Sequence, residues 1–192
     1  VRTVQYIHSV LRSCLYRAVK LGILQRNPII GTSPPKAKYK EMKVLDEEEA
    51  QLLLITSRAK EDRYSALYQL ALTTGMRQGE LLGLKWKDIN WDRKTITVQR
   101  QLARIPGGKL EFVQPKTRSS VRTISLGEMT IAILKEHQKQ QFHESNQKGT
   151  CWQDFDLLFP ASTGTPTNPS NLYYRSFKPL LKDAELPTIR FH

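Results

Sequence analysis

Apolar side chains recur at helical spacing along most of the chain. Residues 3–21 place them at every third or fourth position, which predicts an amphipathic helix that ends at Gly22. Asp46 followed by three glutamates predicts the start of a second helix. Further helices are expected at residues 63–74, 77–84 and 128–145, and from Asn168 onward. This pattern predicts a mainly helical protein.

The middle of the chain has a different period. Apolar and polar residues alternate over 95–102, and shorter strand-like runs follow at 110–113 and 121–124. Residues 106–108 (PGG) form a turn between the first two runs. We therefore expect a small three-stranded antiparallel sheet with a basic hairpin tip, and the fold class α+β, mainly helical.

Residues 29–43 read as a linker between two parts of the chain. Gly31 and two prolines interrupt regular structure, and closely spaced lysines follow, namely Lys36, Lys38, Lys40 and Lys43. The expected organisation is a helical segment at 1–28, a basic linker at 29–43 and a larger domain at 44–192. One helix forms no core alone, so we expect the first helix to dock on the larger domain or to contact a second chain.

The net charge and its distribution narrow the class of binding partner. The net charge is +12; residues 1–43 contribute +8 and residues 100–122 contribute +5. Such patches suit a surface that lies on phosphates, which favours nucleic acid over a solubility tail or a membrane-facing surface. No apolar run has the roughly 20 residues of a membrane span. Cys14 and Cys151 lie far apart without CxxC spacing, which argues against a zinc site or disulfide and favours a reducing cytoplasm.

Arg77 is the first candidate for chemistry. An apolar helix runs into Gly75, and a new helix starts with Arg77 in its first turn and Glu80 three residues on. A guanidinium beside free backbone N–H groups suits a bound phosphate. Lys116 and His192 are two further candidates, but spacing alone does not bring them to Arg77. Each of the three, taken singly, is more simply a surface residue.

Three motifs in order resemble the tyrosine recombinases, the phage-integrase family. Residues 74–89 (TGMRQGELLGLKWKDI) resemble the family's first arginine box, and 114–124 (QPKTRSSVRTI) its lysine hairpin. Residues 189–192 (IRFH) resemble the opening of its second box. Residues 1–28 resemble the end of the core-binding domain, so the resemblance covers the whole chain. It implies a tyrosine-recombinase catalytic domain preceded by a helix from a truncated core-binding domain.

The resemblance assigns roles to these residues. Arg77 would bind the scissile phosphate and stabilise its charge, and Lys116 would be the general acid for the 5′-oxygen leaving group. His192 would hydrogen-bond the same phosphate, while Glu80 would orient Arg77 or brace its helix. No metal or other cofactor would be required. Contacts to the DNA backbone are expected from Lys36, Lys38, Lys40, Arg100, Arg118 and Arg122.

The family pattern also predicts what the chain does. A second arginine and a nucleophilic tyrosine should follow His192, and each tyrosine present precedes that position. We therefore expect a piece of a longer protein that binds double-stranded DNA but does not cleave it. The intact protein would carry out site-specific recombination of a mobile element as a homo-tetramer on DNA. The alternatives are a type IB topoisomerase-like enzyme, a non-catalytic DNA-binding accessory protein and an RNA-binding basic protein.

Overall fold

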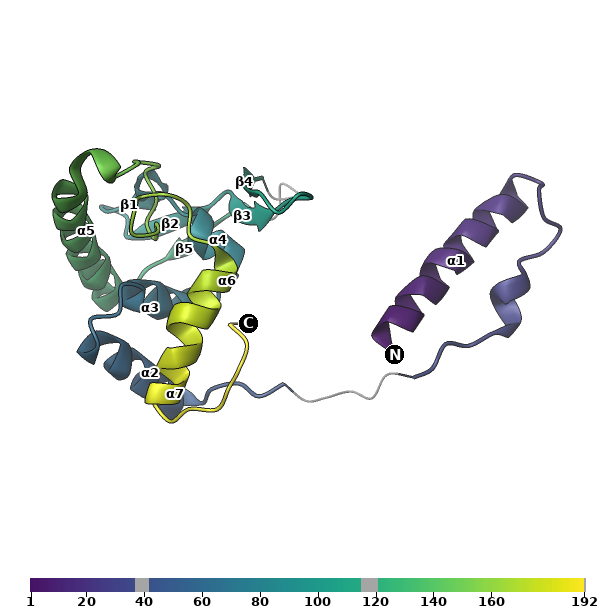
Figure 1. The fold of residues 1–192 in the computed structure, drawn as a ribbon, viewed down its shortest axis with the longest axis horizontal. Helices are drawn as coiled ribbons and strands as arrows, with labels where there is room; N and C mark the ends of the chain where they lie inside the picture. Colours follow the sequence, from purple (N-terminus) through teal and green to yellow (C-terminus); the bar gives the residue numbers. More distant parts are fainter. Residues whose placement is uncertain (37–41, 115–120, 192) are drawn as a thin grey trace. The chain divides into compact units, whose positions relative to one another are not determined.

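The computed structural model describes residues 1–36, 42–114 and 121–191 (Figure 1). The chain divides into two units, Val1–Met42 and Lys43–His192. In the part that the structure describes, no helix is long and apolar enough to cross a membrane.

The first unit contains one long helix. Helix α1 (Arg2–Lys20) is followed by the short 3-10 helix η1 (Pro28–Gly31). Asn27 links α1 to η1. Its side chain accepts from the Ile29 N–H at 3.1 Å and donates to the Arg12 carbonyl at 3.1 Å. No residue of α1 is buried, so its apolar stripe is left uncovered in this unit.

In the described residues of the second unit, four helices and one composite helix build most of the fold. They are α2 (Glu47–Ala59), α3 (Ser65–Thr74), α4 (Gln78–Gly83), α5 (Glu128–Lys148) and the run α6 (Pro169–Asn171), η5 (Leu172–Phe177) and α7 (Lys178–Asp183). Short 3-10 turns stand at η2 (Trp86–Asp88) and η4 (Gly149–Cys151). Asp46 caps α2 as predicted: it accepts from the Glu49 N–H, and the Glu49 carboxylate accepts from the Asp46 N–H.

The strands with described positions form two small sheets rather than one. Strands β1 (Ile89–Asn90), β2 (Thr95–Val98) and β5 (Arg122–Ser125) make a three-stranded antiparallel sheet in the order β1-β2-β5. Strands β3 (Gln101–Arg104) and β4 (Leu110–Val113) pair as a separate antiparallel ribbon. The fold class is confirmed, but the composition of the sheet differs from the prediction, because the alternating run at 95–102 breaks into two strands and β1 joins the sheet.

One continuous core holds the second unit together. Helix α3, helix α4, strand β2 and helix α5 supply most of its least exposed side chains, among them Leu67, Leu70, Leu81, Leu82, Ile96 and Leu134. Residues 157–159, which lie between α5 and α6, are also buried in this core. Phe142, although apolar, lies on the outer side of α5 and is 64% exposed.

Two glycines bring α4 against the β3–β4 ribbon. A Cβ atom on Gly79 would lie 2.8 Å from the Leu102 carbonyl oxygen, and one on Gly83 would lie 3.0 Å from the Gln101 Cα. Since they are four residues apart, both face the same side of the helix. This close packing fixes the helix that starts after Arg77.

Candidate phosphate-binding site

The polypeptide turns sharply just before Arg77. Helix α3 ends at Gly75, which adopts the left-handed conformation (φ 62°) and donates its N–H to the Ala71 carbonyl at 2.9 Å. The next residue, Met76, is buried in the core and anchors the turn. Arg77 then occupies the N-cap position of α4, and its side chain is 76% exposed. This local fold presents a guanidinium to solvent from a rigidly held backbone.

Glu80 lies beneath Arg77 and is only 6% exposed. Its carboxylate accepts from the Arg77 backbone N–H at 2.9 Å and, more weakly, from the Arg77 guanidinium Nη1 at 3.4 Å. The first contact satisfies a backbone N–H at the start of α4 that has no partner within the helix. Glu80 therefore braces the start of α4.

Arg122 reaches Glu80 from the first residue of β5. Its Nη1 donates to Oε1 at 3.0 Å and its Nη2 to Oε2 at 2.8 Å, a two-pronged ion pair. This pair lowers the pKa of the Glu80 carboxyl to about 2, although burial opposes the shift, and the Arg77 N–H contributes to the lowering. The same hydrogen bonding raises the pKa of the Arg122 guanidinium. Glu80 is thus an anion throughout the neutral range.

A second buried ion pair supports the other end of α4. Asp88 accepts from the Lys85 N–H at 2.8 Å, from the Gln99 side chain at 2.7 Å and from the Arg100 guanidinium. The Arg100 side chain is 17% exposed and also approaches the Gly83 carbonyl at 3.4 Å. The loop after α4 is therefore joined to the strand region through Asp88.

Two of the residues expected to contact DNA are paired with buried carboxylates in the structure. Arg100 and Arg122 direct their guanidinium groups at the buried carboxylates of Asp88 and Glu80. A buried carboxylate needs a cation, and in both cases that need competes with phosphate binding. Lys36 is exposed in the first unit. The remaining predicted residues, Lys38, Lys40, Lys116, Arg118 and His192, lie outside the residues that the structure describes.

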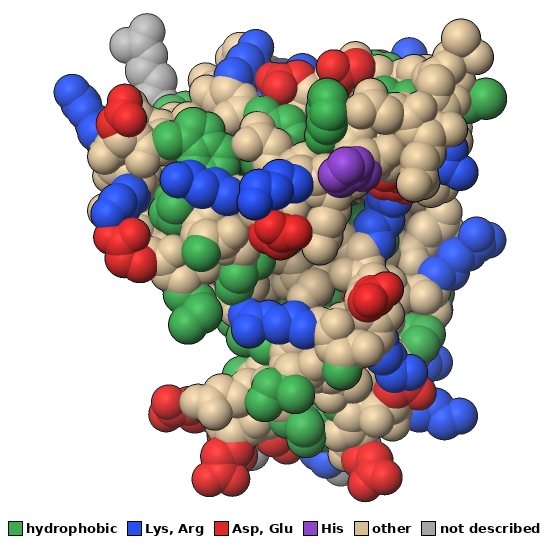
Figure 2. Space-filling view, turned by 90° about the vertical axis from the view of Figure 1, so that its left-hand side faces the viewer, with side chains coloured by type: hydrophobic (Ala, Val, Ile, Leu, Met, Phe, Trp, Pro, Cys, Tyr) green, Lys and Arg blue, Asp and Glu red, His purple; other side chains and the backbone are tan. Residues whose placement is uncertain are grey.

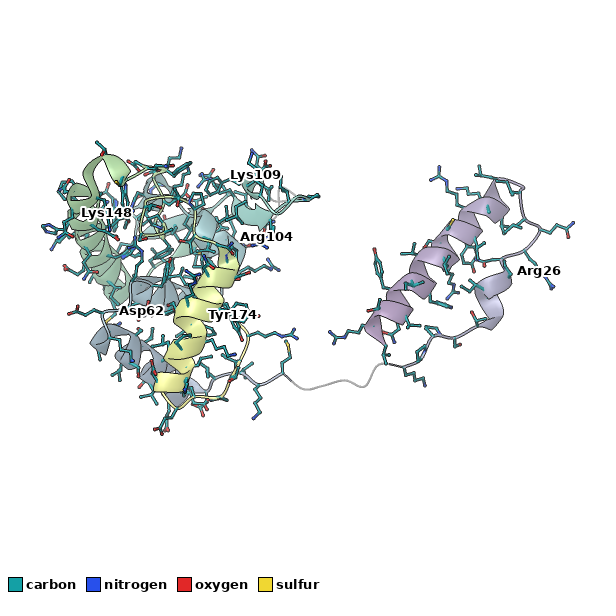
Figure 3. All side chains as sticks on the ribbon, in the orientation of Figure 1. Arg26, Asp62, Arg104, Lys109, Lys148 and Tyr174 are labelled. Carbon is teal, nitrogen blue, oxygen red and sulfur yellow. The ribbon has the colours of Figure 1, made fainter. Side chains whose placement is uncertain are left out.

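Arg104, which the sequence analysis did not single out, lies beside the start of α6. It is exposed on β3 (Figure 3). Its Nη2 donates to the Asn168 Oδ1 at 3.3 Å. Asn168, from which a helix was expected, caps α6 by accepting from the Ser170 N–H at 2.9 Å. Gln78, next to Arg77, donates to the Pro169 carbonyl at 3.2 Å. The starts of α4 and α6 therefore adjoin, and the basic run at 100–122 was the available signal for Arg104.

The face that carries α5 has a different character (Figure 2). Lysine and arginine side chains are interspersed there with aspartate and glutamate, around a hollow of about 530 Å³. Arg63 and His137 line this hollow, and burial lowers the pKa of the His137 imidazole. The acidic side chains on this face oppose the attraction of a polyanion by its lysines and arginines, whereas Arg77 is exposed at a helix start.

The tyrosines of the second unit include core and surface residues. Tyr68 is buried and its hydroxyl hydrogen-bonds Ser176, which in turn donates to Asp62 at 2.8 Å. Burial raises the pKa of the Tyr68 phenol. Tyr173 donates to the Ile189 carbonyl at 3.3 Å, and Tyr174 is exposed on the π-helical segment η5. Among the residues with described positions, no group of three or more His, Cys, Asp and Glu could hold a metal ion.

The fold and the arginine-centred site define a tyrosine-recombinase catalytic domain. The model of the phage integrase family matches residues 43–192, and the chain belongs to this family. Members of the family are enzymes named as integrases and recombinases.

Similar proteins come from several bacteria. A "Tyrosine recombinase XerC-like" protein from Caldanaerobacter subterraneus subsp. tengcongensis is 31% identical over 100% of this chain and 52% of its own length. The ICEBs1 integrase of Bacillus subtilis is 27% identical over 100% of the chain and 51% of its own. The chain therefore spans about half the length of the curated relatives it matches.

Solved structures share the fold. A Tn1549 transposon integrase in complex with transposon right end DNA superimposes with a TM-score of 0.79 at 22% identity, covering 95% of this chain and 58% of that one. The XerA recombinase gives a TM-score of 0.58 at 21% identity, covering 96% and 56%. At these identities the likeness concerns the architecture.

Proposed function

We propose that this chain is the phosphate-binding part of a longer integrase that integrates or excises a mobile element. The intact protein would act by transesterification through a 3′-phosphotyrosyl intermediate. The single observation that carries the proposal is Arg77: an exposed guanidinium at the start of a helix whose backbone is braced from below by a buried, ionised Glu80.

The reaction chemistry follows from the residue types. In-line attack on a phosphodiester places negative charge on the non-bridging oxygens, and a fixed guanidinium stabilises that charge; removing one such donor costs roughly 10²–10³ in rate. Lys116 is the proposed general acid, because a lysine amine can give up a proton and an arginine cannot. His192 is proposed to hydrogen-bond the same phosphate. These last two roles rest on the sequence motifs.

The proposed partners are double-stranded DNA and further copies of the protein. Similar folds include a Tn1549 integrase bound to DNA and a lambda integrase tetramer bound to a Holliday junction. That this chain has partners of the same kind is part of the proposal. Assembly as a homo-tetramer on DNA and action in the cytoplasm are also proposed. The net charge of +12 supports a polyanionic partner.

The DNA-binding proposal is tested with the chain as it stands. Binding to duplex DNA is measured between 50 and 200 mM salt, in competition with single-stranded DNA and with RNA. We expect duplex selectivity, and we expect Arg77→Gln to lower the slope of log affinity against log salt by about one. Lys139→Gln, on the mixed-charge α5, is the matched loss of an exposed cation and should change little. Equal competition by RNA would favour the RNA-binding alternative.

Cleavage is tested separately. The chain is incubated with a nicked suicide substrate that carries the recombination site, and the products are separated on a denaturing gel. We expect no covalent adduct from the 192-residue chain. An adduct that survives denaturation would overturn the prediction that this chain binds without cleaving.

A further inference from the structure

Glu80 is within reach of two arginines, and it binds them unequally. Arg122 makes two contacts of 2.8 and 3.0 Å, whereas the Arg77 guanidinium makes one contact of 3.4 Å. The Arg122 side chain is 35% exposed and the Arg77 side chain 76% exposed. The buried Glu80 carboxylate is therefore saturated by Arg122, while the Arg77 guanidinium remains largely in solvent.

Removing Arg122 would leave this carboxylate in need of a cation. An unpaired buried carboxylate is strongly unfavourable, and Arg77 is the arginine already in contact with it. Its guanidinium could move in and take both oxygens in the two-pronged geometry that Arg122 now uses. A guanidinium held in that way has lost the donors that a phosphate needs.

We propose that Arg122 is a positioning residue that keeps Arg77 available for phosphate by occupying the Glu80 carboxylate. The proposal rests on the proposed function, since it concerns the same phosphate site. It replaces the expectation that Arg122 itself contacts DNA. The charge of Arg122 acts on the DNA indirectly, through the conformation of Arg77.

The two roles for Arg122 predict different behaviour in double variants. If Arg122 is a positioning residue, Arg122→Gln should weaken duplex binding about tenfold and lower the salt slope by about one, because Arg77 is captured by Glu80. Adding Glu80→Gln removes the capturing charge, so the Glu80→Gln/Arg122→Gln variant should recover the affinity and slope of Glu80→Gln alone. In an Arg77→Gln background, Arg122→Gln should cause no further loss.

A direct contact between Arg122 and DNA would give the opposite pattern. Glu80→Gln would then fail to restore binding, and Arg122→Gln would add its full loss to that of Arg77→Gln. Either result overturns the proposal. Arg122→Lys separates the roles again: a lysine keeps the charge that a phosphate contact needs but lacks the fork that saturates Glu80, so we expect it to bind as weakly as Arg122→Gln.

The same series of variants includes controls for folding and for DNA binding. Far-UV circular dichroism and urea unfolding are recorded for every variant; if Arg122→Gln does not fold, the comparison with Arg77→Gln is made with Arg122→Lys. Lys139→Gln serves again as the surface-charge control. If the unmodified chain shows no salt-dependent duplex binding, the proposed function fails. If it binds and Arg77→Gln has its expected effect but Glu80→Gln does not rescue, only the present inference fails.

Discussion

At the scale of single residues, the site depends on one carboxylate that is nearly removed from water. Glu80 satisfies a backbone N–H of α4, pairs with Arg122 and lies under Arg77. Burying an anion costs free energy unless its oxygens are fully hydrogen-bonded, and here both oxygens have charged or N–H donors. The exposed guanidinium above it is therefore supported by an arrangement that tolerates little change.

The free energy of unfolding should depend on the ionisation of Glu80. Its pKa in the folded protein is lowered to about 2, so the group stabilises the fold above its ordinary pKa of 4.5, and this contribution is lost as the pH falls from there toward 2. The shift corresponds to about 3 kcal/mol. Glu80→Gln should be less stable than the unmodified chain at pH 7, with a difference that shrinks below pH 4.5. Urea unfolding at a series of pH values measures it.

A matched variant shows whether the effect is specific. Glu136→Gln removes a carboxylate that lies on the surface of α5 beside Lys139, and its effect should be within about 0.5 kcal/mol at each pH. A Glu80→Gln difference that stays constant from pH 7 to pH 2.5 would contradict the assignment of the shift to this carboxyl.

Sequence reasoning reached some of these residues and missed the relation between others. Arg77 and Glu80 could be predicted because a helix start and the spacing of three are local features. The pairing of Arg122 with Glu80, and of Arg100 with Asp88, could not, because each joins segments whose approach depends on the whole fold. An arginine in a basic stretch looks the same in sequence whether it faces DNA or a buried acid.

At the scale of elements, α4 is a short helix that exists because it packs. It has six residues, two of them glycines, which is intrinsically unfavourable for a helix. The glycines are needed because the backbone of β3 passes where a Cβ atom would be. The same contact accounts for the break in the strand-like run at 95–102. The alternation continues through the run, but β3 pairs with β4 and packs on α4 instead of joining the sheet.

Alanine at either glycine should therefore destabilise the protein. Gly79→Ala and Gly83→Ala would each improve helix propensity by up to about 1 kcal/mol, but the new methyl groups would meet backbone atoms that cannot easily move. We expect a net loss of about 1–3 kcal/mol in urea unfolding, the typical cost of overpacking. Gly31→Ala is the control, because no atom lies within 4 Å of its added Cβ and its backbone is outside the left-handed region. A gain in stability from Gly79→Ala would contradict the packing described here.

At the scale of the whole molecule, charge is divided between the two units. Residues 1–43 carry nine lysines and arginines and one acid, while the second unit has its basic excess at 100–122. A polyanion that contacts both units would release counterions from both. The assignment of 1–28 to a core-binding domain stays a prediction, as does the docking of the uncovered α1 stripe.

Removal of residues 1–42 tests this division. We expect the shortened chain to bind duplex DNA with a salt slope lower by at least one or two, and the two affinities to converge when extrapolated to 1 M salt, because the lost contacts are electrostatic. Equal slopes would show that the first unit does not contact the DNA. Sedimentation velocity of both chains reports at the same time whether α1 mediates self-association: a monomer in both cases would count against contact with a second chain.

The pairing of Glu80 with Arg122 has a consequence for the order in which the protein is made. The two residues are 42 positions apart, so α4 is synthesised well before the guanidinium that its carboxylate requires. At roughly 5–20 residues per second, β5 follows after about 2–8 s. During that interval the start of α4 has no stable way to bury Glu80. Docking of the arginine box is therefore expected to be a late event on the ribosome, after the sheet has been completed.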